Sequence, residues 1–557
     1  MQFRKYFETI RHMRMHQIIS RVRMRLITKK IPYSHAIVAP LNPKHIHFVV
    51  PKLDFSKAFL SRYHVEAIMQ NKLTFLNETH TINPLENWCA LKSTRLWQFN
   101  LHYFEYLYAL GHAYHTSKDE RYYQKAKQLI TAWIAVNRDA KSDAWHPYTI
   151  SLRLPCWMAC FEMFEPCMRA DKAFQNTLAN AIVTQYDYLK KHLEKSLLGN
   201  HYLENLKALT ITAIFLGSRQ DFTKYLHTYV VALDKQLFAD GMHEELSPMY
   251  HKIMLEGAIK VAYGATQFER KSHYALNRLI EKMLCAMVTL EDGLLRAPFF
   301  NDCAQAIAKP MQALLVTAKE LLLLEGQAKA SLPAAGYYIF KLPRTRATMV
   351  IDCGKIGVAH NPGHGHCDAL SFELFIDGKP VLVNSGTLTY ATGQKRVHYR
   401  STSAHNTVMV GGTEQSECWG AFRVARRVKI GAVQFYNTAN KRFFNGCITT
   451  YLNKKHTRTI TWQGEKACTV TDNVDDAVPS LSYLHVHPSY TVKQQGDYFV
   501  VSNQTQRILK IKPYNVAEMF VEERYYSEVF NIEQQNKCIV CKSNCGKVSF
   551  GYSIEIV

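Results

Sequence analysis

The sequence predicts an α+β chain of more than one domain, in which a helical part precedes an antiparallel β-sandwich. The chain has 557 residues, which is too long for a single ordinary core. Apolar residues follow helical spacing as far as about residue 330 and alternate with polar ones beyond it. This change of period is the main evidence for the division.

The first part reads as many helices of moderate length. Apolar residues recur at i, i+3 and i+4 within 122–134, 178–193 and 311–322. Short polar or Gly/Pro breaks, such as Trp145-His146-Pro147, separate one helix from the next. No repeat of fixed period is visible. A bundle, a solenoid and a closed toroid therefore all stay open on the residues alone.

The second part reads as many short strands with turns between them. Residues 370–376 alternate, Asp377-Gly378 gives a hairpin signal, and Val381 and Val383 alternate again. Similar runs occupy 407–410, 428–435, 457–462, 498–502 and 548–556, and such a pattern is typical of a sandwich. We expect a basic lead-in with the first helices over 1–90, a helical domain over 91–330 and a β-sandwich over 331–557.

Composition narrows the possible partners. Apolar residues make up 47% of the chain and charged residues 20%, so the chain is globular. The net charge of +22 favours polyanions. The sequence shows no Arg/Lys-rich tract with interleaved aromatics and no zinc-finger spacing, so we expect no nucleic acid. Acidic polysaccharide and an anionic membrane surface remain as partners.

The N-terminal 30 residues carry nine Lys or Arg and one acid, Glu8. Apolar residues, among them Phe3, Phe7 and Ile10, fall roughly along one helical face. The segment resembles neither a secretory signal nor a membrane span. A solvated helix and a helix lying on anionic lipid are both compatible with it. We expect a bacterial protein that is cytoplasmic or peripheral at the inner membrane.

Fourteen cysteines are scattered through the chain without a framework spacing, so reduced thiols are expected. Cys538, Cys541 and Cys545 form C-x2-C-x3-C, but the segment around the first two reads as a strand. The sequence therefore gives little support for a metal site there.

Three polar clusters, far apart in sequence, carry candidate chemistry. In the first, 198–205, Gly199 permits a break and Asn200 stands where a helix N-cap is expected, followed by His201. The second, 240–251, holds two His, two Glu and Tyr250 in a short polar loop, with Pro248 at an expected helix start. Caps and turns alone would also explain both clusters.

The third cluster, 361–368, alternates Gly and His at Gly363-His364-Gly365-His366 and leads into a strand. Downstream lie Asn384 and His405. His366, Asn384 and His405 could converge across neighbouring strands, and two His with one oxygen ligand suit zinc or a similar ion. Each His alone is more often a structural hydrogen-bonding group.

These strings together resemble the heparinase II/III family. The resemblance runs from about residue 90 to 480, with block order and spacing preserved. Its blocks are Gly199 to Asn205, Ser247 to His251, Gly363 to Phe372, Arg400 to Thr407, Trp97 to Tyr103 and Trp145 to Arg153. The family implies an incomplete α/α toroid packed on an antiparallel β-sandwich, with the cleft between them.

The resemblance also implies roles. Family lyases cleave at C4 of a uronate by β-elimination, which requires charge neutralisation, a base at C5 and an acid at O4. Asn200 would bind the carboxylate, Tyr250 would be base, acid or both, and His201 or His364 would supply the other proton step. A tyrosine base would need its pKa lowered by a nearby cation or hydrogen bond. Substrate contacts are expected from Trp97, Asn100, His102, Arg153, Glu204, Arg400, Trp419 and Arg423.

One departure from the family pattern concerns the metal. Metal-binding members usually carry Asp where this chain has Asn384, and an amide is a weaker ligand for a hard dication. The expected cofactor is one structural divalent ion, zinc or similar, held by His366, Asn384 and His405. No organic cofactor is expected.

The sequence thus indicates a polysaccharide lyase acting on a uronate-containing, glycosaminoglycan-like polymer, linked to capsule or exopolysaccharide metabolism. A uronyl C5-epimerase needs nearly the same residues and remains the alternative. A non-catalytic glycan-binding protein is a third reading, which the four candidate catalytic residues disfavour. The polymer, its linkage, endo or exo action and the oligomeric state stay open.

Overall fold

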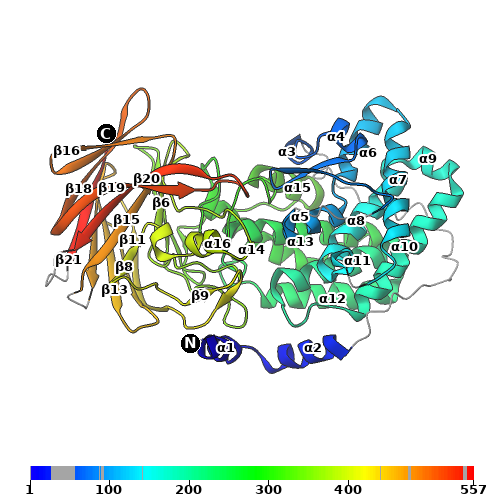
Figure 1. Cartoon of the computed structure of the whole chain (residues 1–557), viewed down its shortest axis with the longest axis horizontal. Helices are drawn as coiled ribbons and strands as arrows, with labels where there is room; N and C mark the ends of the chain where they lie inside the picture. The colour runs from blue at the N-terminus through cyan, green and yellow to red at the C-terminus, as the bar shows by residue number, and fades with distance from the viewer. Residues whose placement is uncertain are drawn as a thin grey trace.

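The structure, a computed structural model, divides into a helical half and a strand half that lie side by side (Figure 1). It describes residues 2–26, 57–86, 88, 93–140, 142–439, 441–474, 478–543 and 549–557. The helical half ends with α15 at Leu322, and the long sheets begin at Ser331. The predicted α+β class, with helices first and an antiparallel sandwich second, is confirmed.

The helical half is built from helices that pack on a continuous apolar core. The N-cap side chains Thr94, Asp171 and Ser247 accept bonds from the first turns of their helices. The helices are α3 (Lys57–Leu60), α4 (Val65–Met69), α5 (Arg95–Tyr103), α6 (Leu107–Ser117), α7 (Arg121–Val136), η3 (Asp143–Trp145), α8 (Pro147–Met163), α9 (Glu165–Ala170), α10 (Lys172–Lys191), α11 (Gly199–Phe215), α12 (Arg219–Lys235), α13 (Pro248–Glu269), α14 (Tyr274–Glu291) and α15 (Met311–Leu322).

Helix α11 occupies the centre of this half. It packs against α8, α12 and α13, and all but two of its residues, His201 and Tyr202, are buried. A helix that is apolar nearly all round belongs inside a helical layer. Its first turn is therefore fixed from several sides, which matters for the residues it carries.

The strand half contains two large antiparallel sheets. One has the order β19-β20-β15-β7-β6-β5-β4-β3, with β8 paired to β15, and the other β11-β12-β13-β14-β21-β18-β17-β16. The bounds of the first are β3 (Ser331–Leu332), β4 (Tyr337–Leu342), β5 (Ala347–Asp352), β6 (Phe372–Ile376), β7 (Lys379–Leu382), β8 (Val408–Val410), β15 (Ser480–Val486), β19 (Val516–Tyr526) and β20 (Gln534–Ser543). Those of the second are β11 (Lys429–Asn437), β12 (Arg442–Thr449), β13 (Lys455–Gln463), β14 (Ala467–Val474), β16 (Thr491–Gln495), β17 (Tyr498–Ser502), β18 (Arg507–Tyr514) and β21 (Ser549–Ile556).

Side chains from both sheets share one apolar core, which makes the half a sandwich. Met349 and Leu374 reach it from the first sheet, and Phe444 and Ile554 from the second. The predicted hairpin at Asp377-Gly378 joins β6 to β7, and both turn residues have positive φ, 53° and 72°. Shorter elements of this half are α16 (Gln394–Tyr399), η4 (Thr402–Ala404), β9 (Cys418–Trp419) and β10 (Arg423–Val424).

Two local features differ from the sequence expectations. A hairpin of β1 (Lys72–Phe75) and β2 (Glu78–Thr81) lies within the lead-in that was expected to hold helices. The strand expected from residue 370 begins at Phe372, because Leu370 takes a left-handed φ of 63°. Among the described residues the cysteines are free thiols, and Cys538 and Cys541 lie in β20 as expected.

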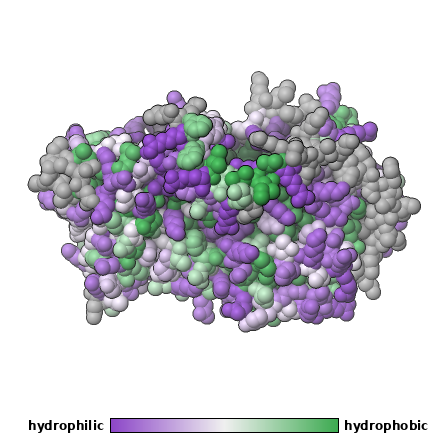
Figure 2. Space-filling view, turned by 90° about the horizontal axis from the view of Figure 1, so that it is seen from below, coloured by the Kyte–Doolittle hydropathy of each residue, from purple (hydrophilic) through white to green (hydrophobic). Residues whose placement is uncertain are grey.

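The N-terminal helices α1 (Gln2–Ile10) and α2 (Met15–Leu26) run along the lower edge of the molecule and contact both halves (Figure 1). Thr9 accepts a hydrogen bond from the indole of Trp419, and Gln17 donates to the carbonyl of Ser196. Seen from below, apolar and polar residues lie side by side on this face (Figure 2). Within the described residues, no helix combines the length and apolarity needed to cross a membrane.

Candidate active site

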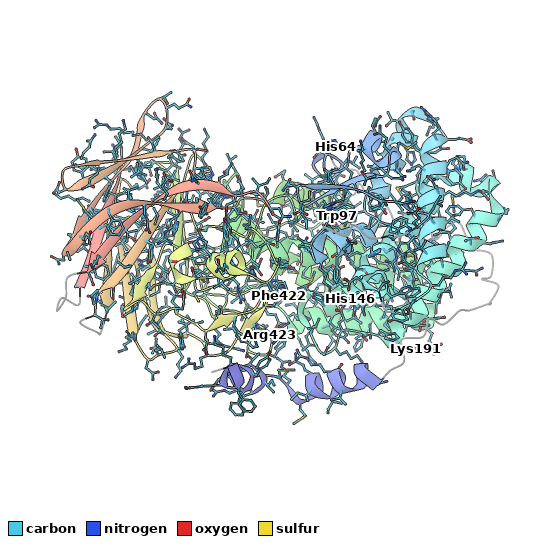
Figure 3. All side chains as sticks on the ribbon, viewed as in Figure 1. His64, Trp97, His146, Lys191, Phe422 and Arg423 are labelled. Carbon is cyan, nitrogen blue, oxygen red and sulfur yellow. The ribbon has the colours of Figure 1, made fainter. Side chains whose placement is uncertain are left out.

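A cavity of about 1520 Å³ lies where the two halves meet, and we call it the cleft. Its walls come from α5, α8, α11 and α13 on one side and from loops of the strand half on the other. His146 and Phe422 line it from opposite halves and face each other across the middle of the molecule (Figure 3). Asn200, His201, Tyr250 and His364, far apart in sequence, all line this one cavity.

Asn200 lies in the first turn of α11 and not at the N-cap, which is Leu198, so the predicted capping role is wrong. Its backbone N–H and its side-chain amide both donate to the carboxylate of Glu245, at 2.9 and 3.0 Å. Gly199 has a φ of 55°, and a Cβ there would lie 2.2 Å from Glu245 Oε1. The glycine therefore allows the carboxylate to reach and orient the Asn200 amide.

His201 is held by a buried carboxylate that the sequence analysis did not select. Its Nδ1 lies 2.8 Å from Glu194 Oε1, and Glu194 Oε2 accepts from Asn205. Burial acts to lower the pKa of His201, but the negative charges of Glu194 and of nearby glutamates outweigh it, and the pKa is raised. The imidazole ring rests against Tyr148, with ring centroids 4.4 Å apart.

Tyr250 stands on the first turn of α13, where its N–H donates to Ser247 at the N-cap. Pro248 begins that helix, as predicted. The phenol oxygen lies 3.1 Å from the hydroxyl of Tyr390, and the ring lies 4.0 Å, centroid to centroid, from His364. Burial, followed by the charges of Asp302 and Glu245, raises the pKa of Tyr250, although Tyr390 and Arg396 oppose this. The expected lowering of its pKa is therefore absent from the ligand-free cleft, and the phenol is protonated there.

Asp302 connects the groups of the site. Its carboxylate accepts from His364 Nδ1 and from His366 Nε2, each at 2.9 Å, and forms a two-pronged ion pair with Arg396. Because an ionised carboxylate can only accept, Nδ1 of His364 carries the proton of this hydrogen bond, and Nε2 is the second nitrogen of the ring. That Nε2 faces the cleft and lies 3.5 Å from Asn200 Nδ2.

The second ring nitrogens of His366 and His405 point at each other. His366 uses Nε2 for Asp302 and His405 uses Nδ1 for the carbonyl of Ser401, so the two facing nitrogens, 3.2 Å apart, both present lone pairs. A carboxylate oxygen of Asp368 completes a group whose ligand atoms lie within 4.8 Å of one another. Burial lowers the pKa of His366 to about 4 and that of His405 to about 3, so both rings are neutral.

These three residues fit a divalent ion better than the predicted set does. Facing lone pairs on neutral imidazoles repel unless a cation or a proton lies between them, and two His with a carboxylate suit zinc. Asn384, the third predicted ligand, is used elsewhere. Its amide donates to the carbonyl of Phe299 and accepts from the N–H of Asn406. Asp368 offers a further ligand atom beside the two histidines, and the set of His366, Asn384 and His405 stays a prediction.

Of the eight residues expected to contact substrate, Asn100 and Glu204 line the cleft. The other six do not, for two reasons. Trp97, His102, Arg153 and Arg400 are buried and bonded within the protein, the guanidinium of Arg153 for example to Gln185 and to two backbone carbonyls. Trp419 and Arg423 pack instead against Tyr6 of α1, outside the cleft, and Figure 3 shows Arg423 directly above that helix.

Four residues that hold the site together were not predicted from the sequence: Glu194, Glu245, Asp302 and Tyr390. Glu245 lay inside a cluster already noted as rich in charge. Asp302 was signalled only by a polar Asn301-Asp302 pair after an apolar run. Glu194 and Tyr390 carried no local signal, because their partners are brought to them by the fold.

Two families of known proteins match this chain, one over each half. The family described as "Heparinase II/III N-terminus" matches residues 58–322, and "Heparinase II/III-like, C-terminal" matches residues 325–549. A heparin-sulfate lyase of Pedobacter heparinus is 25% identical over 347 residues, covering 56% of this chain and 51% of that protein. One of Bacteroides thetaiotaomicron is 22% identical over 445 residues, covering 71% and 63%. The chain thus spans between about half and two thirds of the length of these relatives.

Solved structures share the fold along almost the whole chain. A crystal structure of heparinase III superposes with a TM-score of 0.72 at 15% identity, covering 97% of this chain and 89% of that one. A heparan sulfate lyase of Pedobacter heparinus gives a TM-score of 0.59 at 18% identity, covering 97% and 87%. The helical half is accordingly an incomplete α/α toroid packed on a β-sandwich.

Proposed function

The chain belongs to the heparinase II/III family, and on that premise we propose that it is a polysaccharide lyase that cleaves an acidic, uronate-containing glycan by β-elimination. The observation that carries the proposal is the convergence of Asn200, His201, Tyr250 and His364 on one cleft between toroid and sandwich. A sugar ring in the cleft would meet carboxylate-binding, proton-accepting and proton-donating groups together.

His364 is the better placed base. Asp302 accepts from Nδ1, and in the neutral form of the ring this leaves a lone pair on Nε2 beside the cleft. This lone pair would take the C5 proton of the uronate, and the C5–H electrons would form the C4=C5 double bond. The carboxylate of Asp302 would stabilise the imidazolium that results, as in other carboxylate–histidine pairs.

Tyr250 is the better placed acid. Its pKa is raised by burial, so the hydroxyl is protonated and can give its proton to O4 as the C4–O4 bond breaks. The neighbouring hydroxyl of Tyr390, 3.1 Å away, can donate to the phenolate left behind. Both proton transfers would then start from a neutral His364 and a neutral Tyr250.

Asn200 and His201 would neutralise the substrate carboxylate and so make C5 more acidic. One hydrogen of the Asn200 amide is used by Glu245, and the other faces His364 Nε2 at 3.5 Å, longer than a good hydrogen bond. That second hydrogen is available to a carboxylate. The imidazolium of His201, favoured by Glu194, supplies the positive charge.

The test is a panel of purified acidic polysaccharides followed at the ultraviolet absorbance of the unsaturated uronate. The lyase proposal expects absorbance to rise with at least one uronate polymer and to stay flat with neutral ones. Proton NMR in heavy water on the same samples separates the epimerase alternative, which would exchange the C5 proton and invert C5 without making a double bond. Binding with neither change would indicate a glycan-binding protein.

We also propose that His366, Asp368 and His405 hold one structural divalent ion. Such an ion would fix the loop that carries His364, two residues before His366, and has no role in the proton transfers above. Metal analysis of protein purified without added ions should find about one equivalent, and chelation should lower the melting temperature. Metal-free protein whose melting is unchanged by chelator would contradict this.

A link to capsule or exopolysaccharide production, with contact to an anionic membrane, is a further proposal. Its support is the pair α1 and α2, where Phe3 is 86% exposed, Phe7 61% and Ile19 61% beside several arginines. Vesicles containing anionic lipid should sediment the protein, and vesicles of neutral lipid should not. Replacing Phe3 and Phe7 by Ser should abolish sedimentation while lyase activity persists. Equal sedimentation of the variant would refute the contact.

A further inference from the structure

We propose that the glycan bound in the cleft carries uronate carboxylates but few or no sulfate groups. This rests on the proposed lyase function and narrows its substrate class. It also separates this chain from its relatives, two of which are named for heparin sulfate. The proposal follows from the contacts that the lysines and arginines lining the cleft make within the described residues.

The lysines of the cleft already have carboxylate partners. Lys207 pairs with Glu204. Lys252 lies 2.9 Å from Glu291, a pair that is almost fully buried. Lys260 and Lys309 share a single acid. Glu256 Oε1 lies 2.9 Å from the ammonium of Lys260 and 4.0 Å from that of Lys309.

These glutamates belong to the wall of the cleft itself. Burial would raise the pKa of Glu256, but Lys260 and Lys309 outweigh it and lower the pKa to about 2. Glu204, Glu256 and Glu291 all line the cavity. A sulfate brought to any of these lysines would therefore also approach a carboxylate.

The arginines of the cleft are engaged as well. Arg95 makes a two-pronged pair with Asp143, at 3.0 and 2.8 Å. Arg296 makes another with Glu373, in which both side chains are buried. Arg62 donates to the carbonyl of Ala308 and rests over the ring of Phe59, so it is held by neutral groups and its charge is not offset by these contacts.

The arginines that were expected to contact the substrate also lie outside the cleft. Arg153 and Arg400 are buried and bonded to carbonyls, and Arg423 stacks on Trp419 and Tyr6 next to helix α1. The chain has a net charge of +22, but this excess of positive charge is not concentrated on the described walls of the cleft. A chain dense in sulfate needs cations whose charge is not already balanced.

A glycan with a single carboxylate per repeat needs only one anion-binding position at the reacting sugar, and the cleft provides one. His201 and the Asn200 amide face the cavity beside the proposed base and acid, and they suffice for one planar anion. The remaining wall offers aromatic faces, among them Phe99, Tyr103 and Phe422, which suit the apolar faces of neutral sugar rings. Such a wall recognises sugars by shape and stacking more than by charge.

The experiment compares two polymers with the same backbone. The probes are the unsulfated N-acetylhexosamine–uronate polymer and its N- and O-sulfated counterpart, with a uronate homopolymer as a third substrate. We expect kcat/KM for at least one unsulfated polymer to exceed that for the sulfated one about tenfold or more. Turnover of the sulfated polymer at an equal or higher rate would overturn the inference but leave the lyase function standing. Absence of turnover with all three would overturn the lyase function, and the inference with it.

A charge-releasing variant tests the cause. Glu256→Gln removes the carboxylate shared by Lys260 and Lys309, so sulfated polymer should gain on unsulfated polymer by about threefold or more. Glu325→Gln removes the partner of Lys319 in an exposed pair outside the cleft, and should change neither rate. Binding of both polymers to Tyr250→Phe, measured against salt concentration, gives a readout without turnover. An unchanged preference in correctly folded Glu256→Gln would contradict the assigned cause.

Discussion

The hydroxyl of Tyr250 is the smallest group on which the proposed chemistry depends. Tyr250→Phe keeps the ring, which packs against His364, and removes only the proton donor. We expect turnover to fall by ~10²–10⁴-fold while glycan binding and thermal stability stay near the wild-type values. Steady-state kinetics, a binding isotherm and a melting curve measure the three quantities.

Tyr202→Phe is the matched control, because Tyr202 lies on α11, is half-buried and does not line the cleft. It should leave kcat/KM unchanged. If Tyr250→Phe retained full activity on a substrate that the wild type turns over, the role taken from the family would not apply to this chain.

The pH dependence of the reaction should report the pair of Glu194 and His201. The pKa of His201 is raised above its usual ~6.5, so the imidazolium persists to higher pH and is lost as pH rises through the raised value. The pair's contribution to folding has the same sign: it is fully present below the unfolded pKa and fades as pH rises through the folded one. The alkaline limb of kcat/KM should follow this loss.

Glu194→Gln removes the charge that does most to raise the pKa of His201. The alkaline limb of the kcat/KM profile should therefore move to lower pH. The effect should be mainly on KM, because the imidazolium is proposed to bind the substrate carboxylate. Glu165→Gln removes a surface carboxylate on α9, far from the cleft lining, and should leave the profile in place. A Glu194→Gln profile that coincides with the wild type would exclude this role for the pair.

The beginning of α11 depends on one glycine. At Gly199 a side chain would meet two obstacles, a φ of 55° and the carboxylate of Glu245 2.2 Å from the new Cβ. We expect Gly199→Ala to lower the free energy of unfolding by more than the ~1 kcal/mol of a left-handed alanine. It should also reduce kcat/KM at least about tenfold, since Glu245 orients Asn200.

Gly464→Ala separates the two causes. Gly464 has a similar φ of 64° in the turn between β13 and β14, but nothing lies within 4 Å of a Cβ built there. Its substitution should cost stability alone, with activity retained. Equal effects of the two substitutions on activity would mean that the approach of Glu245 is unimportant.

The elements that the sequence predicted well are those whose pattern is local. The helices over 122–134, 178–193 and 311–322 are present as α7, α10 and α15, and the turn at Asp377-Gly378 lies between β6 and β7. Asn200 was misplaced as a cap because the partner of its amide, Glu245, is 45 residues away. The hairpin β1–β2 was not predicted, because its strands are short and half-exposed and show little alternation of apolar and polar residues.

The sequence motifs predicted some of the residues that belong to the site, but not how their side chains are oriented. His366 and His405 were expected to lie close together, and their facing ring nitrogens are 3.2 Å apart, but Asp368 beside them was not expected. The expected contacts Trp97, His102 and Arg153 are core residues, since a motif shows which residues recur and not which way they point. Burial and long-range pairing decide that direction, and neither is written in a short string.

The cohesion of the whole molecule depends on charges buried between its halves. Asp302, in the segment after α14, pairs with Arg396 of α16, and both side chains are fully buried. Arg296 of the same segment pairs with Glu373 on β6. Removing one member of such a pair leaves an uncompensated buried charge, which typically costs ~3–5 kcal/mol. The two halves should therefore unfold together in the wild type.

Asp302→Asn tests this. We expect a melting temperature many degrees lower, with hydrogen exchange rising first in peptides of α16 and of the segment after α14. Adding Arg396→Met should restore part of the loss, because the unpaired cation is then gone. Asp292→Asn is the control: Asp292 also joins the halves, through Lys341 on β4, but the pair is exposed and should contribute under ~1 kcal/mol. If Asp302→Asn melted like Asp292→Asn, the buried pair would not hold the halves together, and the alignment of His364 with Tyr250 would have to depend on apolar packing between them.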